Sequence, residues 1–185
     1  PKNDREVDLS PERRIWKAAR TLEWLRLLKA GAFEGQWTKA TIAEQFPHVH
    51  IKDIGHVFFV CDYKHSGEAK ARLVFDGSRQ SPDTYDETFA PTARPESVRL
   101  FHLYCVEHSH AIGQYDVPQA FLQADAEGDI FFYPPPGCSD FPGQIYKCKL
   151  NLYGTKNAAR VWHLRFIQFL HTLGFEADTM DPCFF

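Results

Sequence analysis

The feature that most constrains the fold is an aspartate, Asp116, that lies within an apolar part of the sequence. Residues 112–117 are predicted to form a strand that ends at this side chain, and the residues that follow it are again mostly apolar. A carboxylate at the end of a buried strand is costly unless something binds it, and a divalent cation is its usual partner. A single aspartate is more often a cap or turn residue, so the neighbouring motifs must decide between the two interpretations.

The composition is that of one folded domain. The chain has 185 residues with 44% hydrophobic residues and 16 Phe, which suffice for a core. No apolar run is long enough to span a bilayer, and the polar N-terminal residues are not a secretory signal. The five Cys are scattered without a Cys-x-x-Cys pair, which favours reduced intracellular thiols over a disulfide framework or a zinc site.

The charges are divided unevenly along the chain. The net charge of −3 argues against general nucleic-acid binding. Residues 80–140, however, contain ten acidic residues against Arg94 and Arg99, whereas residues 141–175 contain five basic residues and no acidic one. This division suggests a cation-binding centre beside an anion-binding surface, and two ordinary solvated faces remain the alternative.

The first half of the chain predicts a helix followed by a hairpin. A good start signal and apolar residues at helical spacing predict a helix over residues 10–31. Residues 32–55 show no clear period and are expected to be a loop with one short strand. Two strand-like runs around a turn predict a β-hairpin over residues 56–76, and residues 77–94 are expected to form an ordered loop.

The second half mixes helices and strands without regular alternation. Residues 95–105 are predicted to be helical, residues 130–133 and 145–150 to join residues 112–117 as strands, and residues 157–174 to form a last helix capped by its first residue. The expected fold class is therefore α+β, with the β-hairpin, a small antiparallel sheet and flanking helices.

Several motifs follow one another in a characteristic order. They are Lys70-Ala71-Arg72-Leu73-Val74, Gln80-Ser81-Pro82-Asp83-Thr84-Tyr85-Asp86-Glu87-Thr88-Phe89-Ala90-Pro91, Tyr115-Asp116-Val117-Pro118-Gln119-Ala120-Phe121-Leu122, Tyr133-Pro134-Pro135-Pro136-Gly137, Leu152-Tyr153-Gly154-Thr155-Lys156 and Asp181-Pro182-Cys183-Phe184-Phe185. In this order and at these gaps they resemble the reverse transcriptase of copia-type long-terminal-repeat retrotransposons. The resemblance covers residues 56–185 well and residues 10–55 loosely. It implies the fingers and an incomplete palm of a right-hand polymerase in residues 56–185, after an N-terminal helix and connecting segment in residues 1–55.

The resemblance also implies a nucleotide-binding site. Lys70 and Arg72 match basic residues that hold the triphosphate of the incoming nucleotide, and their charges suit that role. Phe121 matches an aromatic residue that lies under the sugar and excludes a 2′-hydroxyl. Tyr153 and Lys156 match a segment that touches nucleotide and template. The alternatives are a wet hairpin face for the two basic residues and plain core packing for Phe121.

Catalysis in this family rests on carboxylates and two Mg²⁺ ions. Asp116 matches the first metal-binding aspartate and is the expected catalytic residue, with the Val117 backbone carbonyl as a further metal ligand. Two metal ions would stabilise the attacking and leaving oxygens of phosphoryl transfer. The basic residues of the last third are expected to bind nucleic acid, and they are Lys147, Lys149, Arg160 and Arg165.

The chain departs from the family pattern in two places. Asn157-Ala158-Ala159 lacks a Pro that the pattern usually has, and the Tyr-x-Asp-Asp turn with the other two aspartates is absent. We therefore expect the chain alone to lack polymerase activity, as a fragment of a larger polyprotein or a decayed copy. Implied partners of the parent are an RNA or DNA template-primer, deoxynucleotides and the remaining polyprotein, but no membrane, and its implied location is a cytoplasmic virus-like particle or the nucleus.

Two other interpretations stay open. The first is a relic that binds nucleic acid through its basic residues and has lost the chemistry. The second is a metal-dependent hydrolase centred on Asp116, Asp125 and Asp129, which requires the three carboxylates to converge within about 5 Å.

Overall fold

The protein is described by a computed structural model that covers residue 1 and residues 4–185. Five α-helices lie in the described part of the chain, namely α1 (Asp4–Leu9), α2 (Arg13–Lys29), α3 (Lys39–Gln45), α4 (Pro95–Glu107) and α5 (Ala158–Thr172). The strands are β1 (Phe33–Trp37), β2 (Gly55–Tyr63), β3 (Ala69–Phe75), β4 (Phe131–Tyr133) and β5 (Ile145–Cys148). None of the helices within these described residues is long and apolar enough to cross a membrane.

One five-stranded sheet organises the fold, in the order β1-β5-β4-β2-β3. The α+β prediction is confirmed, but the sheet is mixed rather than antiparallel, because β2 and β4 run parallel with Gly55 opposite Phe132. A long connection that includes α4 separates these two strands along the chain, and only such a crossover allows neighbouring strands to run in the same direction. The sheet contains strands from both sides of the boundary expected at residue 55.

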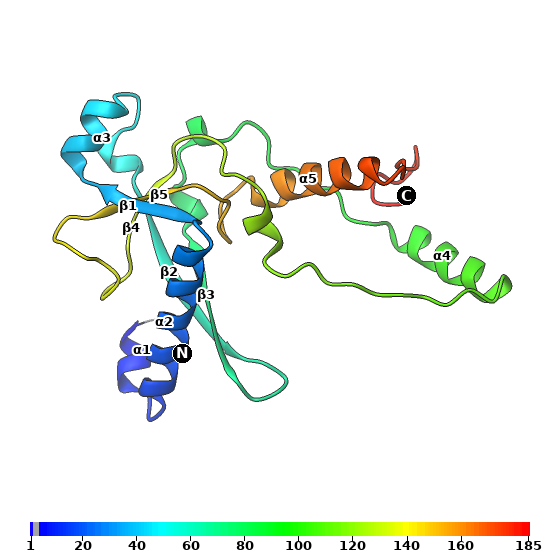
Figure 1. The fold of residues 1–185 in the computed structure, drawn as a ribbon, viewed down its shortest axis with the longest axis horizontal. Helices are drawn as coiled ribbons and strands as arrows, with labels where there is room; N and C mark the ends of the chain where they lie inside the picture. The colour runs from blue at the N-terminus through cyan, green and yellow to red at the C-terminus, as the bar shows by residue number, and fades with distance from the viewer. Residues whose placement is uncertain (2–3) are drawn as a thin grey trace.

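The predicted hairpin is confirmed as β2 and β3. The two strands pair antiparallel from Val57 opposite Phe75 to Tyr63 opposite Ala69. Side chains alternate along β3, with Ala71, Leu73 and Phe75 buried and the residues between them half-buried. The hairpin extends away from the rest of the sheet beside α2 (Figure 1).

The core lies on both faces of the sheet. Adjacent residues of β4 point to opposite faces, so Phe132 joins Trp24 and Leu27 of α2 in one buried cluster while Phe131 joins a second cluster with Trp37 and the side chain of Ile42 on α3. Edge-to-face aromatic pairs hold both clusters together. Helices α2 and α3 therefore cover different faces of the same sheet.

Residues 32–55 contain more structure than the sequence predicted. They form β1, as expected, and also α3 and a 3₁₀ turn η1 (Ile51–Asp53). Helix α3 begins with a reciprocal capping box, in which Thr38 Oγ1 accepts from the Thr41 N–H and Thr41 Oγ1 accepts from the Thr38 N–H. The cap uses Thr in place of the usual Glu or Gln, so the start signal is less evident in the sequence.

The N-terminal helix starts later than predicted. Ser10 accepts a hydrogen bond from the Glu12 N–H in a turn, and α2 begins at Arg13. Asn157 was predicted to cap α5, and it does occupy the N-cap position, but its side chain makes no capping hydrogen bond. Asn157 instead donates from Nδ2 to Glu127, which ties the start of the helix to a distant loop.

The predicted strand over residues 112–117 does not form. These residues belong to no helix or strand, and the Tyr115 side chain is 94% exposed. They run as an extended segment from the end of α4 back to the sheet (Figure 1). A strand needs a neighbour to satisfy its backbone groups, and no described strand pairs with this segment.

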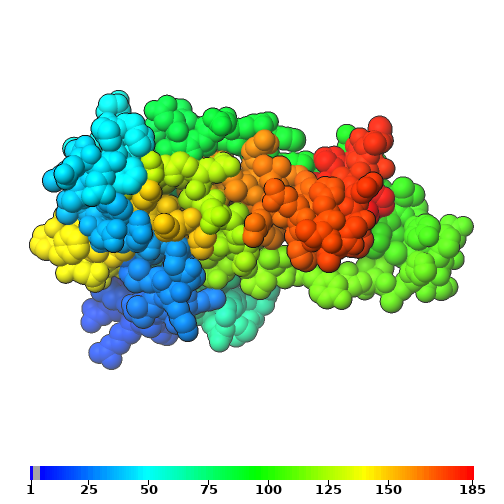
Figure 2. Space-filling view, turned by 45° about the horizontal axis from the view of Figure 1, so that its top comes forward, coloured from blue at the N-terminus to red at the C-terminus, as the bar shows by residue number. Residues whose placement is uncertain are grey.

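The C-terminal segment is attached to α4. The Asp181 carboxylate is buried and accepts hydrogen bonds from the backbone N–H groups of Arg94 and Cys183, at 2.8 and 3.0 Å. Hydrogen bonds from the Ser97 side chain and then from these N–H groups hold the pKa of Asp181 below its usual value. Figure 2 shows the last residues and α5 lying beside α4 on the same side of the molecule.

Candidate functional site

The turn of residues 153–156 lies against the end of β3. The backbone N–H of Phe75 donates to the Tyr153 carbonyl at 2.7 Å, and Val74 and Tyr153 form a parallel bridge. The same turn leads directly into α5. The motif around Tyr153 is thus joined to the strand that carries Lys70 and Arg72, although about eighty residues separate the two motifs in the sequence.

Two glycines make this junction close. Gly154 has a φ of +91°, and a Cβ built there would lie 2.2 Å from the Phe75 carbonyl oxygen. A Cβ on Gly77, in the 3₁₀ turn η2 (Gly77–Arg79), would lie 2.2 Å from the Gly154 carbonyl oxygen. Side chains cannot approach backbone atoms so closely, so both positions require Gly.

An aromatic pair forms at the same place. The ring centroids of Phe121 and Tyr153 are 5.1 Å apart, with the planes tilted by 59°. Phe121 lies in a 3₁₀ turn η4 (Ala120–Gln123), which begins after Gln119 in the left-handed conformation with φ of +53°. A non-glycine residue in this conformation is uncommon and marks a backbone held by its surroundings. Both aromatic residues of the predicted nucleotide site therefore meet beside β3.

The predicted phosphate ligands occupy the half-buried face of β3. Lys70 and Arg72 alternate with the core residues and lie on the same side of the strand as Val74. At about 3.4 Å per residue, their α-carbons lie about 14 and 7 Å from that of Val74. Burial raises the pKa of the Glu23 carboxyl on α2. The charge of Arg26, a hydrogen bond from the Leu73 backbone and, more weakly, the charges of Lys70 and Arg72 oppose that rise. The basic residue that acts most strongly on this carboxyl is therefore Arg26 of the same helix, 3.9 Å away, rather than a residue of β3.

Lys156 is held by the loop that follows β3. Its backbone N–H donates to Gln80 Oε1 at 2.8 Å, and its ammonium donates to the Tyr85 hydroxyl at 3.0 Å and lies 5.2 Å from the centre of the Tyr85 ring. Neither Gln80 nor Tyr85 was predicted as a site residue. Both belong to a motif quoted above, but single Gln and Tyr residues in a polar loop carry no specific signal.

Asp116 and Val117 lie apart from these contacts. Both are exposed on the unpaired segment, and the Asp116 side chain makes no hydrogen bond or ion pair with the described residues. No three metal-binding side chains of residue 1 and residues 4–185 lie close enough together to share an ion. One exposed carboxylate and one carbonyl do not form a site for the two Mg²⁺ ions that the resemblance implies.

The predicted basic surface is largely neutralised within the chain. Lys147 contacts Asp129 at 2.7 Å, Lys149 approaches Glu34 at 4.0 Å, and Arg160 contacts Glu87 at 2.9 Å. Arg165 is exposed and lies beside a groove between α5 and the loop of residues 123–127. The acidic and basic residues that the sequence separates are thus brought together by the fold.

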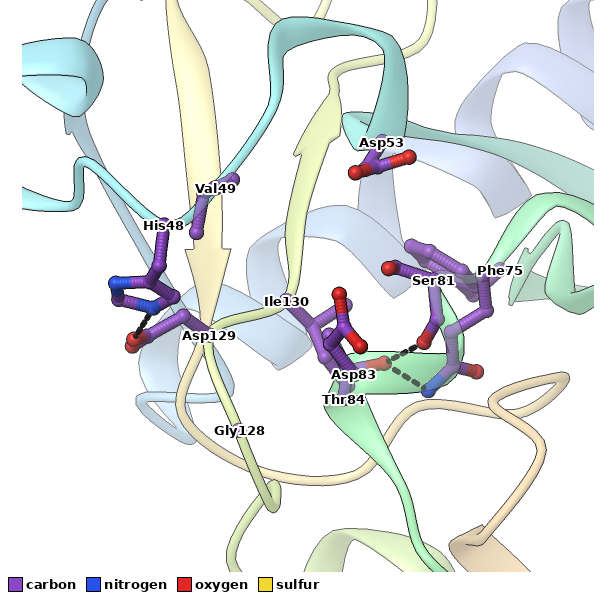
Figure 3. Close-up of a pocket in the computed structure, with 11 residues that line it drawn as sticks. His48, Val49, Asp53, Phe75, Ser81, Asp83, Thr84, Gly128, Asp129 and Ile130 are labelled. Atoms are coloured by element: carbon purple, nitrogen blue, oxygen red, sulfur yellow. Dashed lines mark hydrogen bonds and ion pairs between the residues drawn. The ribbon is translucent and has the colours of Figure 1, made fainter.

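A small cavity of about 110 Å³, lined in part by Gln80, lies between the loop of residues 48–53, the Ser81–Thr84 turn and residues 128–130 (Figure 3). Asp129 forms one wall, where it bonds His48 as well as Lys147. The hydrolase alternative requires Asp116, Asp125 and Asp129 to converge on one metal site. In the part of the chain described, Asp129 is ion-paired with Lys147 and no three metal-binding side chains lie together, so this alternative is contradicted.

Comparison with known proteins gives the family. The sequence matches the reverse transcriptase (RNA-dependent DNA polymerase) family over residues 45–185. It is 36% identical over 146 residues to a retrovirus-related Pol polyprotein from transposon RE1 of Arabidopsis thaliana. The alignment covers 75% of this chain and 10% of that protein. It is 34% identical over 117 residues to the Pol polyprotein of transposon TNT 1-94 of Nicotiana tabacum, covering 62% of the chain and 9% of the relative. No solved structure matches.

The chain belongs to the reverse transcriptase family. A transposon Ty1-H Gag-Pol polyprotein of Saccharomyces cerevisiae is 30% identical over 119 residues, covering 60% of the chain and 6% of the relative. The resemblance to retrotransposon polyproteins is therefore confirmed, and the chain spans a tenth or less of the length of these relatives.

Proposed function

We propose that this chain is the fingers and part of the palm of an RNA-directed DNA polymerase of a copia-type retrotransposon polyprotein, and that it binds the incoming deoxynucleotide beside β3. One observation carries the proposal. Phe121 and Tyr153, 32 residues apart in the sequence, pair at 5.1 Å where the Tyr153 carbonyl bonds to the strand of Lys70 and Arg72. An aromatic surface next to basic side chains suits a ligand that has both a ring system and phosphates.

Different residues of the proposed site suit different parts of the nucleotide. Arg72 can bind phosphate oxygens through two N–H groups, and Lys70 and Lys156 add point charges. The Phe121 ring gives the sugar an apolar surface on which an extra hydroxyl would lose its hydration. Mg²⁺, when bound to the complete polymerase, activates the 3′-hydroxyl and stabilises the leaving pyrophosphate.

The whole-protein properties are part of the proposal. In the parent polyprotein, template-primer and the remaining polymerase regions complete the active site, with Asp116 and the Val117 carbonyl as metal ligands. Residues 1–55 are an N-terminal helix and connecting segment before the fingers, and the element acts in a cytoplasmic virus-like particle, in the nucleus or in both. The similarity to Pol polyproteins of retrotransposons supports this assignment.

A binding experiment tests the nucleotide site. We expect a fluorescent deoxynucleoside triphosphate to bind the chain, with affinity reduced roughly ten-fold in Arg72→Ala and in Lys156→Ala, because each loses a charge-assisted hydrogen bond. Lys29→Ala removes an exposed positive charge at the end of α2 and is the matched control. Equal losses in all three variants would show only a general charge effect and would reject the site.

A second experiment tests the nucleic-acid surface. Binding to an RNA–DNA duplex should be salt-sensitive, and neutralising Arg160 or Arg165 should each reduce the slope of log affinity against log salt by about 0.7–0.9 if each contacts one phosphate. Slopes unchanged from the wild-type chain would reject this surface.

A primer-extension assay tests the expected lack of synthesis. We expect none from the chain alone, because one exposed carboxylate cannot hold two metal ions. Mg²⁺-dependent synthesis that disappears in Asp116→Ala would contradict this expectation.

The second candidate function is a non-catalytic nucleic-acid-binding relic. Asp116 favours it, because its side chain is exposed and has no partner among the residues that the structure describes. A Tyr-x-Asp-Asp motif encoded in frame after residue 185 would favour the polymerase, and a stop codon there would favour the relic.

A further inference from the structure

Gln80 is a buried polar side chain near the proposed nucleotide site, and its amide is hydrogen-bonded through both oxygen and nitrogen. It is 4% exposed and lies directly after the η2 turn that follows β3. Its Oε1 accepts from the Lys156 N–H at 2.8 Å, and its Nε2 donates to Thr84 Oγ1 at 3.0 Å. Thr84 Oγ1 in turn donates to the Ser81 carbonyl, as Figure 3 shows. Each half of the Gln80 amide therefore has a defined partner.

The Lys156 N–H has few other possible partners. Lys156 lies in the turn just before α5, and its N–H donates to no backbone carbonyl of the described residues. Gln80 supplies that acceptor, and burial makes the bond costly to lose. The position of the Lys156 backbone is thus set by a side chain from a loop 76 residues earlier in the sequence.

The same loop also directs the Lys156 side chain. The Tyr85 hydroxyl accepts from the ammonium, while the Lys156 Cγ lies 3.6 Å from where a Cβ on Gly77 would be. The aliphatic part of Lys156 therefore crosses the η2 turn. An ammonium has three N–H donors, so the bond to Tyr85 leaves two for a phosphate.

We propose that Gln80 is a positioning residue of the nucleotide site, which acts through Lys156 by fixing the turn from which that side chain reaches the phosphates. This inference rests on the proposed function, because it needs Lys156 to contact the nucleotide. Gln80 itself touches no ligand. Its role is to keep the ammonium in place before the nucleotide arrives, which lowers the entropic cost of binding.

A merely structural role is the competing explanation, and Gln144 provides the control for it. Gln144 is also 4% exposed. Its Oε1 accepts from the Asp140 N–H, and its Nε2 donates to the Gly35 carbonyl and to the Asp140 carboxylate. It lies just before β5 on the β1 side of the sheet, away from the 153–156 turn. Replacement of either Gln by Met keeps the length and removes all of its side-chain hydrogen bonds, and Gln144→Met, which loses one bond more, should lose at least as much stability as Gln80→Met.

The experiment is a double-mutant cycle read by binding of the fluorescent deoxynucleoside triphosphate. We expect Gln80→Met to weaken binding several-fold, Lys156→Ala to weaken it about ten-fold, and the double variant to bind no worse than Lys156→Ala. Gln144→Met should bind like the wild-type chain although it unfolds at lower urea concentration. Affinities are measured well below the unfolding transition of each variant.

The possible results distinguish a failure of the proposed contact between Lys156 and nucleotide from a failure of the positioning role of Gln80. If Lys156→Ala binds as well as the wild-type chain, the proposed contact of Lys156 with nucleotide is wrong. If Lys156→Ala weakens binding but Gln80→Met does not, only the positioning role is overturned. Losses that add in the double variant, or an equal loss in Gln144→Met, would also overturn it, because Gln80 would then act through general stability.

Discussion

The contact between Gly154 and β3 can be measured by comparing two Gly→Ala variants. Gly154 and Gly174 have φ values of +91° and +85°, so Ala is strained equally at both. At Gly174 nothing lies within 4 Å of the new Cβ, whereas at Gly154 the Phe75 carbonyl oxygen would lie 2.2 Å away and Val74 Cγ1 2.8 Å away. Any difference between the two variants therefore reports the close approach to β3.

The expected magnitudes follow from these contacts. Positive φ costs Ala about 1–2 kcal/mol. The smaller entropy of the unfolded chain returns about 0.4–1 kcal/mol of that cost. Gly174→Ala should thus lose about 1 kcal/mol of unfolding free energy. Gly154→Ala also forces backbone apart, and overpacking costs about 1–3 kcal/mol more. The total loss at Gly154 should be about 2–4 kcal/mol.

Urea unfolding followed by Trp fluorescence measures both values, because three buried Trp residues report on the core. They are Trp16, Trp24 and Trp37. Gly77→Ala is a further arm, since its Cβ meets the Gly154 oxygen from the other side without a positive φ, so it should lose about 1–3 kcal/mol. Equal losses at Gly154 and Gly174 would refute the close junction, and with it the placement of Tyr153 beside β3.

Three further predictions concern other contacts. Asp181→Asn should speed hydrogen exchange at the start of α4 and in residues 176–185. Because the pKa of Asp181 is lowered in the folded protein, its carboxylate should keep these hydrogen bonds at pH values above the ordinary Asp pKa of about 4. Their contribution to stability should be lost as the pH falls through the lowered pKa of the folded protein. Phe121→Val should raise the affinity for ribonucleotides relative to deoxyribonucleotides in competition binding, and an unchanged ratio would favour plain packing. Asp129→Asn should lose about 1–3 kcal/mol in urea unfolding, because it leaves the partly buried Lys147 without its carboxylate.

The sequence predicted local pairing well and distant pairing poorly. The hairpin of β2 and β3 was predictable because alternating apolar residues and a turn signal lie within about twenty residues. Residues 112–117 carry a weaker apolar pattern, and a strand forms only where a neighbour is available, which the local sequence does not specify. For the same reason the sequence led to an antiparallel sheet and did not predict the parallel pairing of β2 with β4.

The candidate site shows the same division. Family motifs gave Lys70, Phe121, Tyr153 and Lys156 as site residues, and their functional roles stay predictions. That Phe121 would lie against Tyr153 depends on the sheet and could not be read from spacing. Gln80 was not predicted because a buried acceptor is defined by burial and by its donor, and a sequence shows neither.

The unpaired segment around Asp116 also sets what this chain can do with metal. Backbone groups of residues 112–117 face water, so no described contact fixes the carboxylate in one position. A Mg²⁺ ion at this single carboxylate would keep most of its water ligands and bind weakly, because tight sites combine several oxygen ligands. A ligand that binds only the folded state raises the free energy of unfolding, and this increase is small when the ligand concentration is not far above Kd. We therefore expect millimolar Mg²⁺ to change the melting temperature of the wild-type chain and of Asp116→Ala by the same small amount. If Mg²⁺ instead stabilises the wild-type chain and Asp116→Ala abolishes that effect, the segment folds around the ion. Asp116 would then share the ion with further ligands that do not lie beside it in this structure.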